Sequence, residues 1–168
     1  KILDKEIDYS INFVEINKNY KSELTNKFPN CIIHSNLKNL KNIYSIVIAN
    51  EFFDCLPMSQ ISSVNGKLYE TIIKKDSKGT LVFDKSAARK RTVEKIGHQL
   101  KKDDFYEYSE ETNNMFNEIA NIVRNNGGIL LIADYGYIIP ANKNSLQSIK
   151  DNKFTEILSN VGKQDITY

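Results

Sequence analysis

The sequence has few of the residues that mark metal sites or disulfide frameworks. It contains two cysteines and two histidines among 168 residues. Cys31 and Cys55 have no CxxC spacing and no pair of histidines nearby, so neither a zinc site nor a disulfide framework is predicted. No apolar run approaches the roughly 20 residues of a membrane helix, and the N-terminal stretch lacks a signal-peptide core. We therefore expect a soluble, intracellular chain in a reducing compartment.

The chain also lacks a strong charge imbalance. Its formal net charge is +2, and 26% of its residues are charged. That balance supplies no field that would predict a nucleic acid or a membrane as the partner. The length suits one domain, and the sequence contains no internal repeat and no low-complexity linker. We predict a single domain over residues 1–168.

Strand-like and helix-like segments alternate along the chain. Apolar patterns predict strands at residues 11–16, 31–34, 45–49 and 128–133, and helices at 18–28 and from an N-cap at Ser109 to about 125. Leu37, Leu40 and Ile43 lie in a polar turn. The strands IVIA and ILLIA are apolar on both faces, which is typical of a parallel sheet covered by helices on both sides. The predicted fold class is therefore α/β.

The pattern of apolar and polar residues changes in the middle of the chain. Residues 60–64 and 68–73 flank Asn65-Gly66, a pattern for a hairpin with a tight two-residue turn, and a third strand follows at 80–83. We predict an antiparallel meander over residues 58–84, inserted in a mostly parallel sheet. The basic segment at 85–102 should be helical in part. It is interpreted either as a solvated face or as a patch for an acidic partner, and no aromatic residues interleave its charges as a nucleic-acid platform would require.

Polar clusters follow three of the apolar strands. In an open parallel sheet, ligands bind beyond the carboxyl ends of the strands. Glu15 follows one strand, Asn50 to Asp54 follow the next, and Asp134 to Tyr137 follow a third. If these strands are neighbours, the three clusters share one crevice.

Glu15 is a candidate for binding a ribose. An acid at the end of the second strand of a nucleotide-binding half can accept hydrogen bonds from both ribose hydroxyls. Dinucleotides and S-adenosylmethionine share this arrangement. The alternative is a surface glutamate at the end of a strand.

The stretch from Asn50 to Asp54, NEFFD, combines an amide, two acids and two rings. A nitrogen nucleophile that attacks a methyl group needs acceptors to orient its N–H groups and aromatic faces to cover a cationic donor. A guanidinium also needs a carboxylate that orients it and receives its proton. In the alternative interpretation, Phe52 and Phe53 are core residues and Asp54 caps a turn.

Asp134 follows a long apolar run, where an unpaired carboxylate would cost several kcal/mol to desolvate. It must therefore lie at the exit of the strand or have partners. Tyr135-Gly136-Tyr137 adds a sharp turn and two rings, which suit either the wall of a pocket or packing at the edge of the sheet.

Six segments together resemble the MidA-like family of class I S-adenosylmethionine-dependent methyltransferases, in the family's order. They are FVEIN at 13–17, ANEFFDCLP at 49–57, GKLYE at 66–70, GGILLIADYGY at 127–137, SLQSIKDNKF at 145–154 and VGKQDIT at 161–167. The family includes the mitochondrial complex I assembly factor that acts on an arginine of a complex I subunit. The resemblance implies a Rossmann-like class I methyltransferase fold, S-adenosylmethionine as cofactor and a protein arginine as acceptor.

The resemblance also implies roles for particular residues. It assigns catalysis to Asn50, Glu51, Phe53 and Asp54, cofactor binding to Glu15, Ile16, Asn36, Leu37 and Asn50, the substrate pocket to Phe52, Asp134 and Tyr135, and no metal. Asn50 would accept from the target nitrogen and Phe53 would pack against it. Either Glu51 or Asp54 would steady the guanidinium.

The family's glycine-rich loop after its first strand has no counterpart here, since no GxGxG occurs, and the family continues beyond the QDIT segment. We therefore expect an incomplete domain. The protein would be cytoplasmic in a bacterium or mitochondrial in a eukaryote, with a protein substrate that could be a complex I subunit. Two alternatives stay open: a truncated, non-catalytic interaction module, and a nicotinamide-dependent oxidoreductase that would use Glu15 in the same way.

Overall fold

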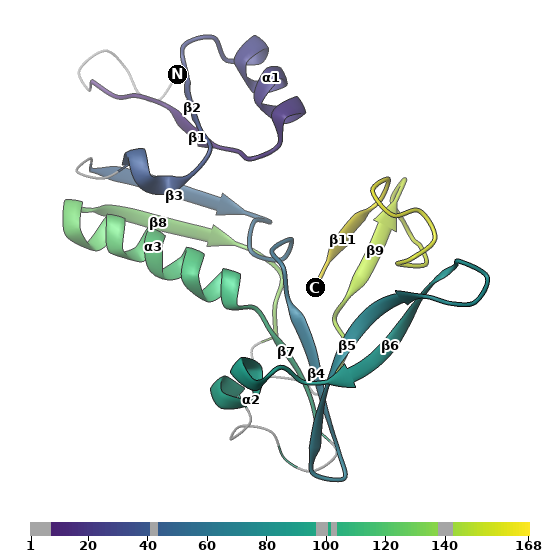
Figure 1. The fold of residues 1–168 in the computed structure, drawn as a ribbon. Helices are drawn as coiled ribbons and strands as arrows, with labels where there is room; N and C mark the ends of the chain where they lie inside the picture. The colour runs from purple at the N-terminus through teal and green to yellow at the C-terminus, as the bar shows by residue number, and fades with distance from the viewer. Residues whose placement is uncertain (1–7, 41–43, 97–100, 102–103, 138–142) are drawn as a thin grey trace. The chain divides into compact units, whose positions relative to one another are not determined.

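The fold is described from a computed structural model for residues 8–40, 44–96, 101, 104–137 and 143–168. Ile43 and the end of the basic segment, 97–100 and 102, lie outside these residues. The chain divides into two compact units, one formed by residues 1–47 and 117–130 and the other by 48–116 and 131–168. Figure 1 shows the helices and strands of both units.

The first unit contains a strand, a helix and a parallel strand. Strand β1 (Asn12–Val14) pairs in parallel with β2 (Ile32–His34), and α1 (Lys18–Lys27) connects them. Asn17 caps the helix, since its side-chain oxygen accepts from the backbone N–H of Asn19 at 2.9 Å. The rings of Phe13 and Phe28 lie 5.4 Å apart. A short 3₁₀ helix, η1 (Leu37–Leu40), follows β2. The two strands and the helix α1 were predicted from the sequence, whereas residues 37–40 were predicted as a polar turn.

Strands β3 (Ser45–Asn50) and β8 (Gly128–Ala133) form a second parallel pair. The backbone N–H of Ser45 donates to the Gly127 carbonyl and that of Glu51 donates to the Ala133 carbonyl, so both bonds have the same offset along the two strands. Gly128 lies very close to β3, because a Cβ atom added there would be 2.1 Å from the Ser45 carbonyl oxygen. Only glycine fits at this crossing.

The prediction that both faces of these strands are covered is not met among the described residues. Ile46 and Ile48 are 65% and 72% exposed, and Leu131 is 53% exposed, whereas Ala49 is buried. Helix α3 (Glu110–Asn126) begins after Ser109, whose hydroxyl accepts from the Thr112 N–H at 2.9 Å, as predicted for the N-cap. Its buried side chains are Ile119 and Ile122.

The second unit is dominated by a four-stranded antiparallel sheet. Its order is β6 (Leu81–Ala87), β5 (Lys67–Lys75), β4 (Ser59–Val64) and β7 (Phe105–Tyr108). Asn65 and Gly66 form the predicted tight turn, with φ of 49° and 75°. The meander is larger than predicted: β6 continues through residues 85–87, which we had assigned to the basic segment, and β7 adds a fourth strand. Helix α2 (Lys90–Ile96) is the helical part of that segment.

A small antiparallel sheet completes the second unit. Strand β9 (Gln147–Lys150) lies between β10 (Lys153–Phe154) and β11 (Asp165–Thr167). Asp151 and Asn152 join β9 to β10 with φ of 51° and 59°, the left-handed conformation that a two-residue turn of this type requires. The chain thus combines parallel strand pairs with antiparallel sheets, which agrees with the predicted α/β class.

Candidate functional site

The residues predicted to bind the cofactor ribose lie in the first unit, at the ends of β1 and β2. The backbone N–H of Glu15 donates to the His34 carbonyl at 2.9 Å, and its Oε1 accepts from the Asn17 N–H at 2.6 Å. Ile16, next to it, is 81% exposed. Among the described residues, Oε2 of Glu15 has no hydrogen-bond partner, so this oxygen could accept from a ligand beside the exposed Ile16.

Asn36 and Leu37, the other predicted cofactor residues, open the 3₁₀ helix. Asn36 accepts from the backbone N–H of Lys38 at 3.0 Å and is exposed, while Leu37 is buried with 6% exposure. Leu37 is therefore packed inside the first unit, and Asn36 is at its surface.

In the second unit, the loop after β3 is held by the first residue after β8. Asp134 Oδ2 accepts from the backbone N–H groups of Phe52, at 3.2 Å, and Phe53, at 2.8 Å. Its Oδ1 accepts from the N–H of Tyr135. As expected, Asp134 lies at the exit of the strand and has partners. Both carboxylate oxygens of Asp134 accept hydrogen bonds from backbone N–H groups, so Asp134 orients the loop after β3.

Glu51 turns the chain at the end of β3. Its φ is 45°, a left-handed conformation that is uncommon outside glycine. Two contacts hold it there: its N–H donates to the Ala133 carbonyl at 2.8 Å, and its Oε1 accepts from the Tyr135 hydroxyl at 2.8 Å. The hydrogen bond to Glu51 raises the pKa of Tyr135, because it stabilises the protonated form of the phenol.

Two of the predicted catalytic residues and two of the pocket residues border one open hollow of about 350 Å³. Phe53 and Asp54 come from the loop after β3, and Asp134 and Tyr135 from the loop after β8. The remaining lining residues are Thr112, Asn113 and Phe116 of α3, Ile132 of β8, and Tyr168. The ring of Phe53 lies 5.1 Å from that of Phe52, edge to face, and 6.4 Å from that of Phe116.

Asp54 is the buried acid of this hollow. Its residue is only 5% exposed, and within the described part of the chain its Oδ1 has no hydrogen-bond partner. Burial raises the pKa of Asp54, and the nearby carboxylates of Asp134, Glu51 and Asp165 raise it further. An acceptor that is buried and unmatched is unusual in a folded protein and calls for an explanation.

Asn50 is exposed at the last position of β3. Among the described residues, its side-chain amide has no hydrogen-bond partner, so both its oxygen and its NH₂ group are available to a ligand. Asn50 belongs to the second unit, as do the residues around the hollow, whereas Glu15, Ile16, Asn36 and Leu37 belong to the first.

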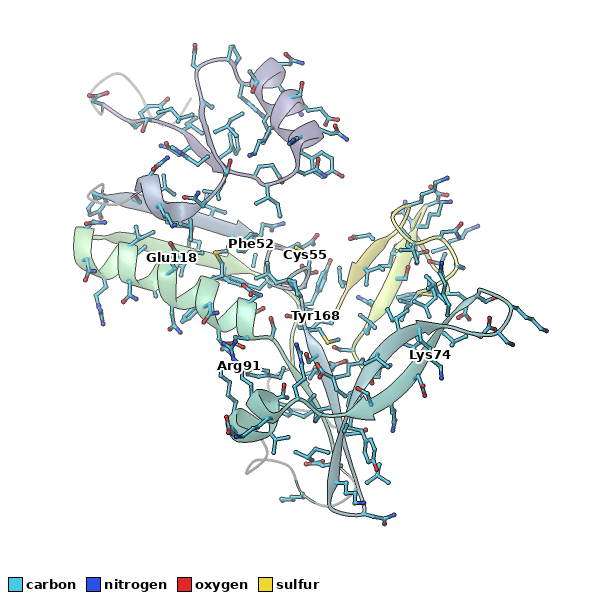
Figure 2. All side chains as sticks on the ribbon, viewed as in Figure 1. Phe52, Cys55, Lys74, Arg91, Glu118 and Tyr168 are labelled. Atoms are coloured by element: carbon cyan, nitrogen blue, oxygen red, sulfur yellow. The ribbon has the colours of Figure 1, made fainter. Side chains whose placement is uncertain are left out.

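Several lining residues were missed by the sequence analysis. The hydroxyl groups of Thr112 and Tyr168 are 2.9 Å apart, and the N–H of Tyr168, which Figure 2 labels, donates to the Asp54 carbonyl at 3.2 Å. Phe116 was also not among the predicted site residues, and it is 44% exposed.

The basic segment is largely paired with acids of its own unit. Arg89 binds Glu70 at two points, Nε to Oε2 at 2.9 Å and Nη2 to Oε1 at 2.6 Å, and Ser59 also donates to Glu70. Burial of Glu70 raises its pKa, but the bonds from Arg89 and Ser59 outweigh this and lower it. Arg91, labelled in Figure 2, and Lys95 both pair with Glu110. These pairs favour the solvated-face interpretation over an acidic-partner patch.

Neither a metal centre nor a membrane helix is present in the part of the chain that the structure describes. No group of three or more His, Cys, Asp or Glu side chains there could hold a metal ion. No helix there is long and apolar enough to cross a membrane.

Comparison with known proteins identifies relatives over most of the chain. A family model described as "Putative S-adenosyl-L-methionine-dependent methyltransferase" matches residues 5–168. The mitochondrial protein arginine methyltransferase NDUFAF7 homolog of Drosophila melanogaster is 29% identical over 140 residues, 80% of this chain and 32% of that protein. The Caenorhabditis elegans homolog is 26% identical over 138 residues, with the same two coverages. This chain spans about a third of the length of these relatives.

Solved structures share the fold. A crystal structure from Burkholderia thailandensis superposes with a TM-score of 0.74 at 14% identity, over 94% of this chain and 46% of that one. A second structure from the same organism, bound to S-adenosyl-homocysteine, has a TM-score of 0.73 at 15% identity and covers 94% and 44%. With the family model matched over nearly the whole chain, these findings show that the chain belongs to a family of S-adenosyl-L-methionine-dependent methyltransferases, the MidA-like family that its motifs resemble.

Proposed function

We propose that the chain is part of a methyltransferase that transfers a methyl group from S-adenosylmethionine to an arginine side chain of a protein. The observation that carries the proposal is the set of carboxylates and rings at the ends of β3 and β8, where Asp54 and Asp134 border one hollow with Phe53, Phe116 and Tyr135. Acids that surround an aromatic hollow suit a cationic, planar acceptor.

The names of the relatives support the same acceptor. Proteins named as mitochondrial protein arginine methyltransferases align with 80% of this chain. The resemblance described above also points to a subunit of respiratory complex I as the protein substrate. The protein would act in mitochondria if it is eukaryotic and in the cytoplasm if it is bacterial.

In this proposal, the cofactor supplies an electrophilic methyl group, and the chain binds and orients. Glu15 would accept from the ribose hydroxyls, with Ile16, Asn36 and Leu37 beside it. Asn50 would accept from the target nitrogen, and Phe53 would pack against the acceptor. Asp134 would act indirectly, since its oxygens hold the loop that carries Phe52 and Phe53.

The test is methyl transfer by the whole protein from methyl-labelled S-adenosylmethionine to a candidate protein substrate, followed by amino-acid analysis of the labelled residue. Methylarginine is expected. Replacing Asn50 with Ala should lower kcat by about 100-fold, as for loss of a group that contacts the reacting atoms, and should weaken cofactor affinity by a smaller factor. Equal losses in both would make Asn50 structural.

Titration with S-adenosylmethionine separates the alternatives. Binding by the whole protein, and by residues 1–168 alone if this part folds, is expected for the methyltransferase. Absence of binding by the whole protein would favour the non-catalytic interaction module. Family membership favours the methyltransferase over the nicotinamide-dependent oxidoreductase.

A further inference from the structure

The β5–β6 hairpin of the second unit carries its charges differently on its two faces. Side chains alternate between the faces along each strand, and the register of the strands places their acids, Glu70 and Asp84, on the same face. Both acids are paired with cations, Glu70 with Arg89 at 2.6 Å and Asp84 with Lys74 at 2.5 Å. Lys74, labelled in Figure 2, lies on this face as well. The charges of this face are therefore balanced.

The opposite face of the hairpin is apolar at its centre and basic around it. Ile73 and Phe83 lie directly opposite each other across the two strands and are 55% and 44% exposed. Lys75 follows this pair in one direction and Lys85 in the other, each about 7 Å along the strands. Lys67 lies on the same face, next to the turn that leads from β4. All three lysines are exposed, and none has an ion pair among the described residues.

This combination of side chains is typical of a surface that binds another protein. Lysine side chains are almost never fully buried unless they are paired, so unpaired lysines around the apolar pair argue against coverage of this face by a hydrophobic core. An apolar centre with a polar rim is the usual composition of a protein–protein interface. Because the charges on this face are all positive, a complementary partner carries carboxylates.

The hairpin fits a protein partner better than a nucleic acid or a membrane. A platform for nucleic acid needs several exposed rings on which bases stack, whereas Phe83 is the one large exposed ring of β5 and β6, both of which the structure describes throughout. A hairpin that enters a membrane needs an apolar tip, but the tip here is Asp76-Ser77-Lys78-Gly79. Oδ1 of Asp76 accepts from the N–H groups of Lys78, at 2.8 Å, and Thr80, at 2.9 Å, so this polar turn is held in place.

We infer that this basic face, formed by Lys67, Ile73, Lys75, Phe83 and Lys85, is a docking surface for an acidic segment of another protein. Apolar side chains of the partner would pack on Ile73 and Phe83. Carboxylates on either side of them would meet Lys75 and Lys85, which are about 14 Å apart along the strands. Docking here goes beyond the proposed function, because it concerns which protein binds and not which residue is methylated.

The experiment measures binding of two fluorescent peptides to the whole protein by fluorescence anisotropy. Both peptides contain the same leucine and phenylalanine pair, which glutamates flank in one peptide and lysines in the other. We expect the glutamate peptide to bind about 10-fold more tightly than the lysine peptide, because only its charges complement the basic face. Its affinity should fall severalfold from about 50 to about 250 mM salt, since the ion pairs are exposed.

Neighbouring positions of β5 provide matched variants. Lys75→Gln and Lys74→Gln remove the same charge from opposite faces of the same strand. Lys75→Gln should weaken binding of the glutamate peptide about threefold, and the double variant with Lys85→Gln about 10-fold, whereas Lys74→Gln should leave it unchanged. Phe83→Thr keeps a residue that favours strands and should also weaken binding. Thermal unfolding confirms that each variant is folded.

Three results would overturn the inference. Equal losses in Lys74→Gln and Lys75→Gln, or no binding of the glutamate peptide, would exclude this face as the docking surface. Tighter binding of single-stranded RNA or of phosphatidylserine vesicles would exclude a protein as the partner.

Acetylation of the whole protein, read by mass spectrometry, should modify Lys75 and Lys85 as readily as Lys78. Protection of Lys75 and Lys85 would show that another part of the protein covers the face and would be the third such result. None of these outcomes depends on methyl transfer, so failure of the proposed function and failure of the docking surface are distinguishable.

Discussion

Asp134 Oδ2 accepts the backbone N–H of Phe53 at 2.8 Å, and the two residues are 81 positions apart in the chain. The same oxygen accepts from Phe52, so one carboxylate fixes the first turn of the loop that holds most of the predicted catalytic residues. The position of that loop therefore depends on the end of another strand.

Replacing Asp134 with Ala should destabilise the second unit by about 1–3 kcal/mol, since two partly buried N–H groups lose their acceptor. Chemical denaturation of the whole protein measures this. Methyl transfer should fall as well, because the loop loses its orientation. Asp134→Asn keeps one acceptor oxygen and should cost less; an equal cost in both variants would show that the charge matters more than the geometry.

Asp54 should make stability depend on pH. Its pKa in the folded chain is raised above the ordinary value of 3.8, so the folded state binds its proton more tightly than the unfolded state. The free energy of unfolding should therefore fall as the pH rises from 3.8 through the raised pKa. Above that window, Asp54→Asn should be more stable than the wild type by about 0.5–2 kcal/mol, the usual gain from a single stabilising substitution.

Equilibrium unfolding of the wild type and Asp54→Asn across this pH range checks the sign. The two should converge below pH 3.8, where Asp54 is protonated in both states. Asp165→Asn, at an exposed position, is the control and should give a smaller pH-dependent gain. Loss of stability in Asp54→Asn at neutral pH would show that the charge has a partner in the native protein.

Glycine should be required far more strongly at position 128 than at position 66. Both have positive φ, but a Cβ at Gly66 meets nothing within 4 Å, whereas one at Gly128 would collide with the Ser45 backbone. Gly66→Ala should cost about 1–2 kcal/mol from its backbone conformation alone. Gly128→Ala should cost more than that because β3 and β8 must separate, and similar melting temperatures for the two variants would contradict this.

Glu15→Ala should weaken binding of S-adenosylmethionine to the whole protein by about 1–3 kcal/mol, the cost of leaving polar partners unmatched. Calorimetry provides the measurement. Glu23→Ala removes the same charge from an exposed position of α1 and should leave the affinity unchanged. Unchanged affinity in Glu15→Ala would remove the ribose role.

The elements predicted correctly are those with a local cause. Ser109 begins α3 because its hydroxyl caps the Thr112 N–H, and Asn65-Gly66 turns the hairpin because both residues accept positive φ. Strand β7 and the end of β6 were missed because they form by pairing with other strands of the sheet. Tyr69 faces Ala87 and Ile61 faces Tyr106 across the sheet, and no local pattern reports such partners.

The site was predictable in the same limited way. The types of residue at the ends of β3 and β8 pointed to a polar cluster. The sequence could not indicate that the Asp134 oxygens accept from backbone N–H groups, or that a buried oxygen of Asp54 has no partner among the described residues. Both features depend on contacts between segments about 80 residues apart. Phe116 and Tyr168 entered the hollow for the same reason. The apolar strand IVIA likewise indicated residues that can be buried, but it could not indicate which elements, if any, cover them.

Three successive N–H groups, those of Glu51, Phe52 and Phe53, are bonded to two successive residues, Ala133 and Asp134. These bonds fix the register between the segment after β3 and the end of β8. An insertion or deletion here would shift these bonds by one position, and an exchange of Asp134 would remove the acceptor of two of them. Among homologues, this stretch should consequently keep its length and keep a side-chain acceptor at the position of Asp134.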